Sequence, residues 1–236
     1  MKIIVLSITA YKEKDGIIEA LSEQGVISFT IKGFYDPKNK FTALNNVVTI
    51  ADVELSDSRY KYPLLKNYSI IQSPMKENSD LTYMGALMYL SDLTRKLVQD
   101  EEKEMIFKHL YAALISLKGA QEPWMILLIY MANICKATGY DFDVSGCVFC
   151  GKKKGIATFS FEDGGFVCQD CLEQERYEKP FNNEQMLLLR AAFMAGDYAH
   201  THEYCSKENA LTILNRFNIF FMENYGVSIS ALALLN

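Results

Sequence analysis

A chain of 236 residues, half of them hydrophobic, is long enough to bury a core and to form one or two domains. Its longest apolar run, residues 124–132, spans about half a bilayer, which argues against a membrane helix. The formal net charge of -5 excludes a surface that is basic overall, so any contact with nucleic acid must be local. The first thirty residues lack the pattern of a cleavable signal peptide, so a cytoplasmic location without membrane contact is expected.

The first seventy residues have the alternating hydrophobicity of β-strands. Strands are expected at residues 3–6, 27–31, 47–55, 60–65 and 68–71. Pro63 confines the fourth of these to a sheet edge. Residues 17–21 fit either a short helix capped by Asp15 or a strand that follows a turn. A unit this small is too short for a two-sheet sandwich, so the pattern predicts a barrel that leaves no open edge.

Beyond these strands the pattern becomes helical. Residues 73–80 are polar and contain Pro74, so we expect a linker between a domain at residues 1–75 and a second domain at residues 80–236. Apolar periodicity and capping residues predict helices at residues 81–90, 105–117, 123–139 and 206–226, and a further helix that Asn182 or Asn183 caps and that runs to Gly196. The third is apolar on nearly every side, which places it at the centre of the helical domain.

Two Cys-x-x-Cys pairs separated by seventeen residues carry the strongest chemical signal in the chain. Cys147, Cys150, Cys168 and Cys171 predict one closed zinc(II) site with a structural role, because four thiolates fill the tetrahedral shell of the ion. Between the pairs, Glu162-Asp163-Gly164-Gly165 lies between two β-prone runs. This pattern predicts a hairpin that returns the second pair to the first.

The residues beside the cysteines support one zinc ion per chain. Gly151 has no side chain, so its amide can turn toward a thiolate. Lys152, Lys153 and Lys154 can offset part of the charge of about -2 that four thiolates leave around zinc. An iron–sulfur cluster, two disulfides and a thioredoxin-like redox pair are the alternatives. The first lacks a dense cysteine run, the second needs an oxidising compartment, and the third needs only one pair.

The order of these parts, with a four-cysteine insertion at residues 147–171 among the helices, resembles the RecO family of bacterial recombination mediators over nearly the whole chain. The most specific matches are Gly139-Tyr140, Cys147-Val148-Phe149-Cys150-Gly151, Phe159-Ser160 and Gly164-Gly165-Phe166-Val167-Cys168. In the first half, residues 11–15, Gly25, Lys32-Gly33, Pro37-Lys38, Leu44 and residues 47–50 follow the order of the family's barrel loops.

The resemblance implies a multidomain β + α protein. An N-terminal OB-fold barrel, with residues 17–21 in its second strand, would precede an α-helical domain that carries the inserted four-cysteine zinc segment. The function implied is that of a non-enzymatic DNA repair and recombination mediator, which binds single- and double-stranded DNA and anneals complementary strands. Together with RecR, such a protein helps load RecA onto strands coated by single-strand-binding protein, and a helical groove receives the C-terminal tail of that protein. It would act in the cytoplasm, on the nucleoid.

A barrel binds nucleic acid by tracking phosphates with basic side chains and by stacking bases on aromatic rings. The candidate phosphate contacts are Lys12, Lys14, Lys32, Lys38, Lys40 and Arg59, and the candidate stacking groups are Tyr11, Phe34, Tyr35 and Phe41.

Some positions depart from the family pattern and weaken the expected DNA contacts more than the expected fold. Val26 and Phe34-Tyr35-Asp36 stand where basic residues are expected, Asn46 lies near an expected proline, and residues 226–230 lack an expected basic residue. Two other functions stay open. A thiol or metal enzyme would need an open coordination position or one reactive cysteine pair, and a zinc-ribbon adaptor would bind proteins without binding DNA.

Overall fold

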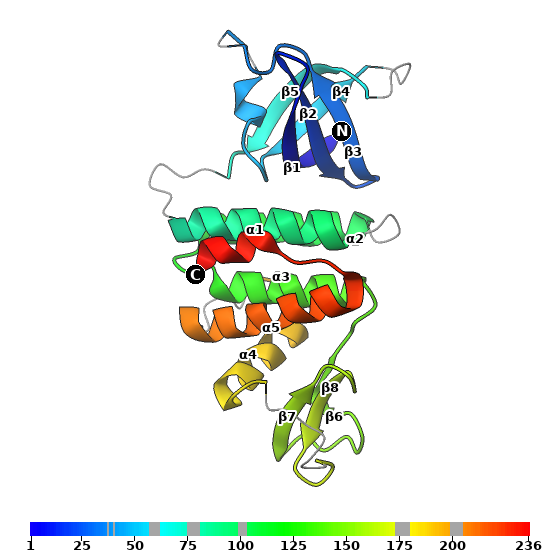
Figure 1. The fold of residues 1–236 in the computed structure, drawn as a ribbon, viewed down its shortest axis with the longest axis vertical. Helices are drawn as coiled ribbons and strands as arrows, with labels where there is room; N and C mark the ends of the chain where they lie inside the picture. The colour runs from blue at the N-terminus through cyan, green and yellow to red at the C-terminus, as the bar shows by residue number, and fades with distance from the viewer. Residues whose placement is uncertain are drawn as a thin grey trace.

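The computed structural model describes residues 1–36, 38–39, 41–56, 62–74, 81–98, 103–172, 180–198 and 205–236. A five-stranded sheet lies at one end of the molecule, helices fill the middle, and a three-stranded sheet lies at the other end (Figure 1). The predicted class, a β unit followed by helices that contain a four-cysteine insertion, is confirmed. Among the described helices, none is long and apolar enough to cross a membrane.

The N-terminal sheet is antiparallel throughout, with the strand order β3-β2-β1-β4-β5. Its strands are β1 (Lys2–Tyr11), β2 (Asp15–Ser22), β3 (Gly25–Ile31), β4 (Ile50–Leu55) and β5 (Leu65–Gln72). The ambiguous residues 17–21 are therefore a strand. Ile18 pairs with Ile8 on one side and Phe29 on the other, and it is fully buried. Its β-branched side chain suits that position between two strands.

Two of the strand predictions are wrong at their boundaries. The strand expected from residue 47 begins only at Ile50, because Val48 has a φ of 56°, a left-handed conformation that no strand contains. The segments expected as two strands at residues 60–65 and 68–71 give one strand, β5; residues 60 and 61 lie outside the described part. Pro63 precedes β5 and accepts a hydrogen bond from the Thr30 amide at 2.8 Å. Within the described residues, an isolated bridge from Thr30 of β3 to Leu64, just before β5, connects the two edges of the sheet, so a closed barrel stays a prediction.

The helices agree with the predicted periodicity. They are α1 (Leu81–Leu97), α2 (Lys103–Gly119), α3 (Trp124–Ala137), α4 (Asn183–Met194) and α5 (Lys207–Tyr225). Every residue of α3 except Lys136 is buried, as its apolar surface predicted. Asn182 and Ser206 cap α4 and α5, and Gly226 ends α5 in a left-handed conformation. A C-terminal 3₁₀ helix, η2 (Ser230–Leu235), was not predicted and packs on α1.

One hydrophobic core joins the N-terminal sheet to the helices. Ile4, Leu6 and Leu21 belong to the same buried cluster as the side chains of α1 and α3. The Ser91 hydroxyl of α1 donates a buried hydrogen bond of 2.6 Å to the Leu6 carbonyl. The N-terminal sheet is therefore held on the helices by packing as well as by the chain, and its opposite end faces solvent (Figure 1).

Candidate metal centre and nucleic-acid interface

The four predicted cysteines come together at one end of the second sheet. Cys147 ends β6 (Asp143–Cys147), Cys168 ends β8 (Gly165–Cys168), and Cys150 and Cys171 lie in the turns that follow. Their sulfur atoms all lie within 4.8 Å of one another, and the Cys150 and Cys168 sulfurs are 3.5 Å apart. Sulfurs at about 2.3 Å from a tetrahedral zinc ion would be roughly 3.8 Å apart. The cluster therefore has the size and donor set of a four-cysteine metal site.

The predicted hairpin brings the second cysteine pair into place. Strand β7 (Ile156–Ser160) pairs with β8 in antiparallel fashion through the expected glycine turn. In addition β6 pairs with β8 in parallel, which was not predicted and sets the first pair beside the second. A Cβ atom on Gly165 would lie 2.1 Å from the Asp143 carbonyl oxygen. Only glycine therefore allows this close approach of β6 and β8.

Backbone amides stabilise negative charge inside the cluster. Burial acts to raise the pKa of Cys147, but hydrogen bonds from the amides of Cys168, Cys150 and Phe149 outweigh it and lower this pKa to about 6. The neighbouring Cys150 thiol is the main cause that raises the pKa of Cys171, to about 12. A divalent cation would favour the fully deprotonated form of all four groups, which is the form that binds metal.

Gly151 contributes in a way that differs from the expectation. It has a φ of 71°, but its amide donates to the Cys147 carbonyl at 2.8 Å and not to a thiolate. The amide of the next residue, Lys152, instead hydrogen-bonds to the Cys150 sulfur. Glycine thus makes the turn, and the next residue supplies the donor.

The lysines beside the cluster are not equivalent. Lys152 forms an ion pair with Asp170, and this contact is the main cause of its raised pKa. The charges of Cys150 and Cys168 act on Lys152 in the same direction, so it lies close enough to offset thiolate charge. Lys153 and Lys154 are exposed to solvent. Asp170 lies between Cys168 and Cys171, so its carboxylate competes with the thiolates for the positive charge of Lys152.

An aromatic cluster fixes the cysteine-bearing sheet to the helices. Phe142 lies 5.2 Å from Phe159 and 5.4 Å from Phe220 of α5 between ring centroids, and Phe217 lies 5.8 Å from it. Arg190 of α4 donates through Nε to the Val144 carbonyl at 2.9 Å. Sequence reasoning missed Arg190, because no local spacing links a helix residue to a strand 46 positions away.

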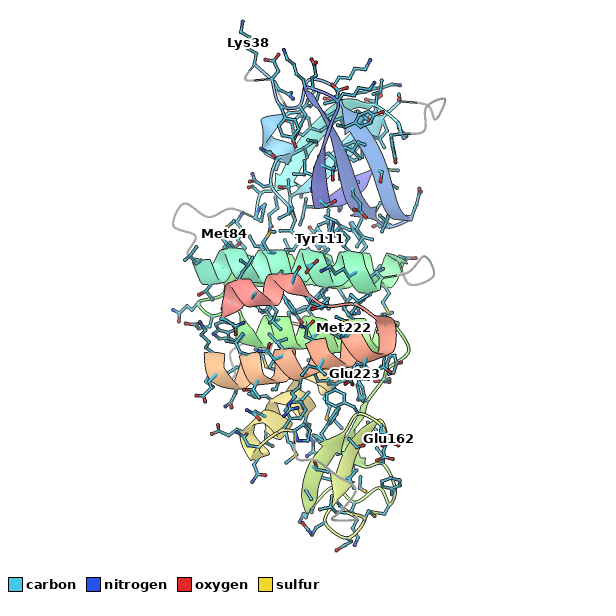
Figure 2. All side chains as sticks on the ribbon, viewed as in Figure 1. Lys38, Met84, Tyr111, Glu162, Met222 and Glu223 are labelled. Carbon is cyan, nitrogen blue, oxygen red and sulfur yellow. The ribbon has the colours of Figure 1, made fainter. Side chains whose placement is uncertain are left out.

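The candidate DNA contacts gather at the end of the N-terminal sheet that is farthest from the helices. The β1–β2 turn and the loop after β3 are joined there, since the Tyr35 amide donates to the Lys14 carbonyl at 3.0 Å and the Gly33 amide donates to the Asp15 carboxylate at 2.9 Å. Figure 2 shows Lys38 at this tip of the molecule. The exposed candidates on this turn and loop are Tyr11, Lys12, Lys14, Lys32, Tyr35 and Lys38.

Phe34, Phe41, Lys40 and Arg59 are the remaining candidates. Phe34 is only 4 % exposed and belongs to the core of the sheet, so it has no ring face to offer to a base. Phe41 is half-buried against Tyr68, with ring centroids 5.6 Å apart. Lys40 and Arg59 lie outside the described residues. The surface at the tip therefore combines four lysines with two tyrosines.

The fold and the cysteine cluster define a class of multidomain β + α proteins, in which an antiparallel five-stranded sheet precedes helices that carry a four-cysteine insertion. Two family models match the chain: "Recombination protein O N terminal" over residues 1–74 and "Recombination protein O C terminal" over residues 78–226. The chain belongs to the RecO family, whose role lies in DNA repair and recombination.

Several curated relatives carry the name "DNA repair protein RecO". The protein of Halalkalibacterium halodurans is 25 % identical over 189 residues, which cover 79 % of this chain and 74 % of the relative. That of Bacillus pumilus is 26 % identical over 189 residues, covering 79 % and 73 %. That of Lactobacillus acidophilus is 27 % identical over 169 residues, covering 71 % and 68 %.

Proposed function

We propose that this protein is a recombination mediator that binds single- and double-stranded DNA, anneals complementary strands, and with RecR helps load RecA onto strands coated by single-strand-binding protein. Membership of the RecO family supports this proposal. Its role would be one of binding and alignment, without a catalytic residue. The place of action would be the cytoplasm, at the nucleoid, where its DNA substrates lie.

The observation that carries the proposal is the joined turn and loop at the free end of the N-terminal sheet. Lys12, Lys14, Lys32 and Lys38 are exposed there, beside Tyr11 and Tyr35. Lysines neutralise phosphates and tyrosines stack on bases, and this combination suits a single strand. A local basic surface also agrees with a chain whose net charge is -5, because the remainder of the molecule carries the acidic excess.

We propose zinc(II) as the metal of the four-cysteine cluster, one ion per chain, held by Cys147, Cys150, Cys168 and Cys171. The four-sulfur donor set and the closeness of the sulfurs support zinc in a structural role. The ion would hold together the ends of β6 and β8 that carry the cysteines. The aromatic cluster packs this sheet against α5, so the ion would also stabilise the position of the sheet on that helix.

The same proposal assigns a separate role to each of the two expected domains. Residues 1–75 would form an OB-fold barrel that contacts DNA, and residues 80–236 would form the helical domain. RecR and the C-terminal tail of single-strand-binding protein are proposed partners of the whole protein. The tail is acidic and apolar, so it would suit a groove between helices.

The test is strand annealing with complementary labelled oligonucleotides, with and without single-strand-binding protein. We expect the protein to accelerate pairing, and the double variant Lys12→Gln/Lys38→Gln to lose much of this effect, because two phosphate contacts would be removed. Lys118→Gln, which removes an exposed lysine at the end of α2, is the matched control and should anneal normally. Pairing no faster than in buffer, together with no complex with RecR, would refute the proposal. A complex with RecR without any salt-dependent DNA binding would indicate an adaptor.

A further inference from the structure

We propose that Tyr35 is a base-stacking platform, through which the tip of the N-terminal sheet selects strands with unpaired bases over duplex DNA. This inference rests on the proposed function and names the feature of DNA that the site recognises.

The Tyr35 ring is exposed but rests on a buried neighbour. It is 47 % exposed, and its ring meets that of Phe34 edge-on, with centroids 5.1 Å apart and planes at 85°. Phe34 fills the space above Gly16, where an added Cβ atom would lie 2.8 Å from the Phe34 ring. Glycine at position 16 therefore lets Phe34 sink into the core while the next side chain projects outward. The edge-on contact is a favoured aromatic geometry and orients the Tyr35 ring.

The backbone around Tyr35 is also held in place. Its amide donates to the Lys14 carbonyl at 3.0 Å. On one side of it, Gly33 turns with a φ of 62° and donates to the Asp15 carboxylate at 2.9 Å. The Asn39 side chain donates to the Gly33 carbonyl at 2.7 Å and ties down the far end of the loop. Because the ring is already positioned, a base that stacks on it pays little ordering entropy.

The charges beside Tyr35 favour stacking over phosphate binding as the selective contact. Lys14 lies 4.0 Å from the carboxylate of Asp36, the residue after Tyr35, so this carboxylate offsets part of the Lys14 charge. The Asp36 carboxylate also accepts the Lys38 amide at 3.0 Å, which keeps a negative group within the loop. A phosphate backbone gains less at this point than at a purely basic loop, whereas an uncharged base face meets no such opposition.

Tyr11 is the natural comparison, since it is 39 % exposed at the same tip. The Lys12 ammonium lies 5.2 Å from the centre of the Tyr11 ring, in a cation–π contact that occupies one ring face. Tyr35 makes a T-shaped contact with Phe34 and has no such cation over its ring among the described residues. Tyr35 is therefore the better platform. Bases in duplex DNA are stacked on one another and offer it no free face.

The test compares three ligands of equal length at one salt concentration: a single-stranded oligonucleotide, its duplex, and a single strand in which abasic sites replace the bases. We expect Tyr35→Ala to weaken binding of the normal single strand by roughly 5- to 150-fold, the range for loss of one stacked base. Binding of the duplex and of the abasic strand should stay unchanged. Tyr35→Phe should bind as the wild type does, because the Tyr35 hydroxyl makes no hydrogen bond within the described part of the chain.

The matched control is Ile219→Ala, which removes a side chain of similar exposure on α5, far from the tip. It should bind all three ligands as the wild type does. Single-strand binding by Tyr35→Ala that equals the wild type would overturn the inference, and so would an equal loss on all three ligands. If the wild type itself bound none of them, the proposed function would fail and the inference with it, so the two failures are distinguishable.

Discussion

The guanidinium carbon of Arg190 lies 5.2 Å from the centre of the Phe166 ring. Arg190 belongs to α4, whereas Phe166 lies in β8, two residues before Cys168. The same side chain donates to the Val144 carbonyl of β6. Arg190 thus contacts both of the strands that end in cysteines of the cluster, and it holds these strands against α4.

Replacing Arg190 should therefore destabilise the protein. We expect Arg190→Ala to lower the free energy of unfolding by about 1–3 kcal/mol, since it leaves the Val144 carbonyl without this donor and removes the cation–π contact. Arg190→Lys keeps the charge but loses the Nε donor, so its free energy of unfolding should lie between those of the wild type and Arg190→Ala. Urea unfolding followed by circular dichroism measures both. Arg216→Ala, an exposed arginine on α5, is the control and should change stability by about 0.5 kcal/mol or less.

Removal of the metal should destabilise the helical domain as well as the three-stranded sheet. Elemental analysis should find one zinc per chain, and a strong chelator should lower the melting temperature, because Phe142 and Phe159 pack against α5 through Phe217 and Phe220. Loss of the ion should loosen these contacts, since metal binding and folding are coupled in such sites.

Serine variants separate the cluster from the other cysteines. Cys150→Ser and Cys168→Ser should lose zinc and melt at lower temperature. Cys205→Ser should keep both properties, because Cys205 lies just before the N-cap of α5 and outside the cluster. A purified protein without stoichiometric zinc would contradict this prediction, and so would zinc retained by both cluster variants.

Sequence periodicity and capping residues predicted most of the fold, because those signals are local. Asn182, Ser206 and Gly226 act at the helix ends where their side chains or φ angles are needed. The strand boundary near Val48 could not be predicted, because apolar alternation continues through the turn and does not encode its positive φ. Periodicity reports which face is apolar, and it does not report the backbone conformation at one residue.

The candidate site was predictable only in part for the same reason. The cysteines could be identified from spacing alone, and the hairpin from its glycines. The parallel pairing of β6 with β8 depends on contact between Asp143 and Gly165, which are distant in the chain. Likewise Phe34 is buried and Tyr35 is exposed because the Phe34 ring fits into the space above Gly16. No sequence pattern around residue 34 indicates this contact.

The C-terminal helix η2 should depend on Asp92. The carboxylate of this nearly buried residue accepts hydrogen bonds from the Ala231 amide and the Ser230 hydroxyl, each at 3.2 Å, and from the Lys96 ammonium at 3.0 Å. Asp92→Ala leaves these donors without their acceptor, so we expect a loss of about 1–3 kcal/mol in unfolding free energy. Hydrogen exchange should quicken at residues 229–235 in particular. Asp52→Ala, an exposed aspartate on β4, should leave exchange there unchanged.

His109 should make stability depend on pH. Burial, and secondarily the charge of Lys136, lowers the pKa of this α2 histidine below its usual value of 6.5. The unfolded chain then binds a proton that the folded chain does not, over the interval between the lowered pKa and 6.5. The folded state therefore loses stability as pH falls through that interval, and gains it as pH rises toward 6.5.

His109→Gln removes the titrating group, so its stability should fall less between about pH 7.5 and about pH 5.5 than that of the wild type. Urea unfolding at both values measures the difference. Carboxylates titrate in both proteins and cancel in the comparison. Equal pH dependence in the two proteins would mean that the histidine is protonated in the folded state as readily as in the unfolded chain, and that its burial beside Lys136 has no energetic effect.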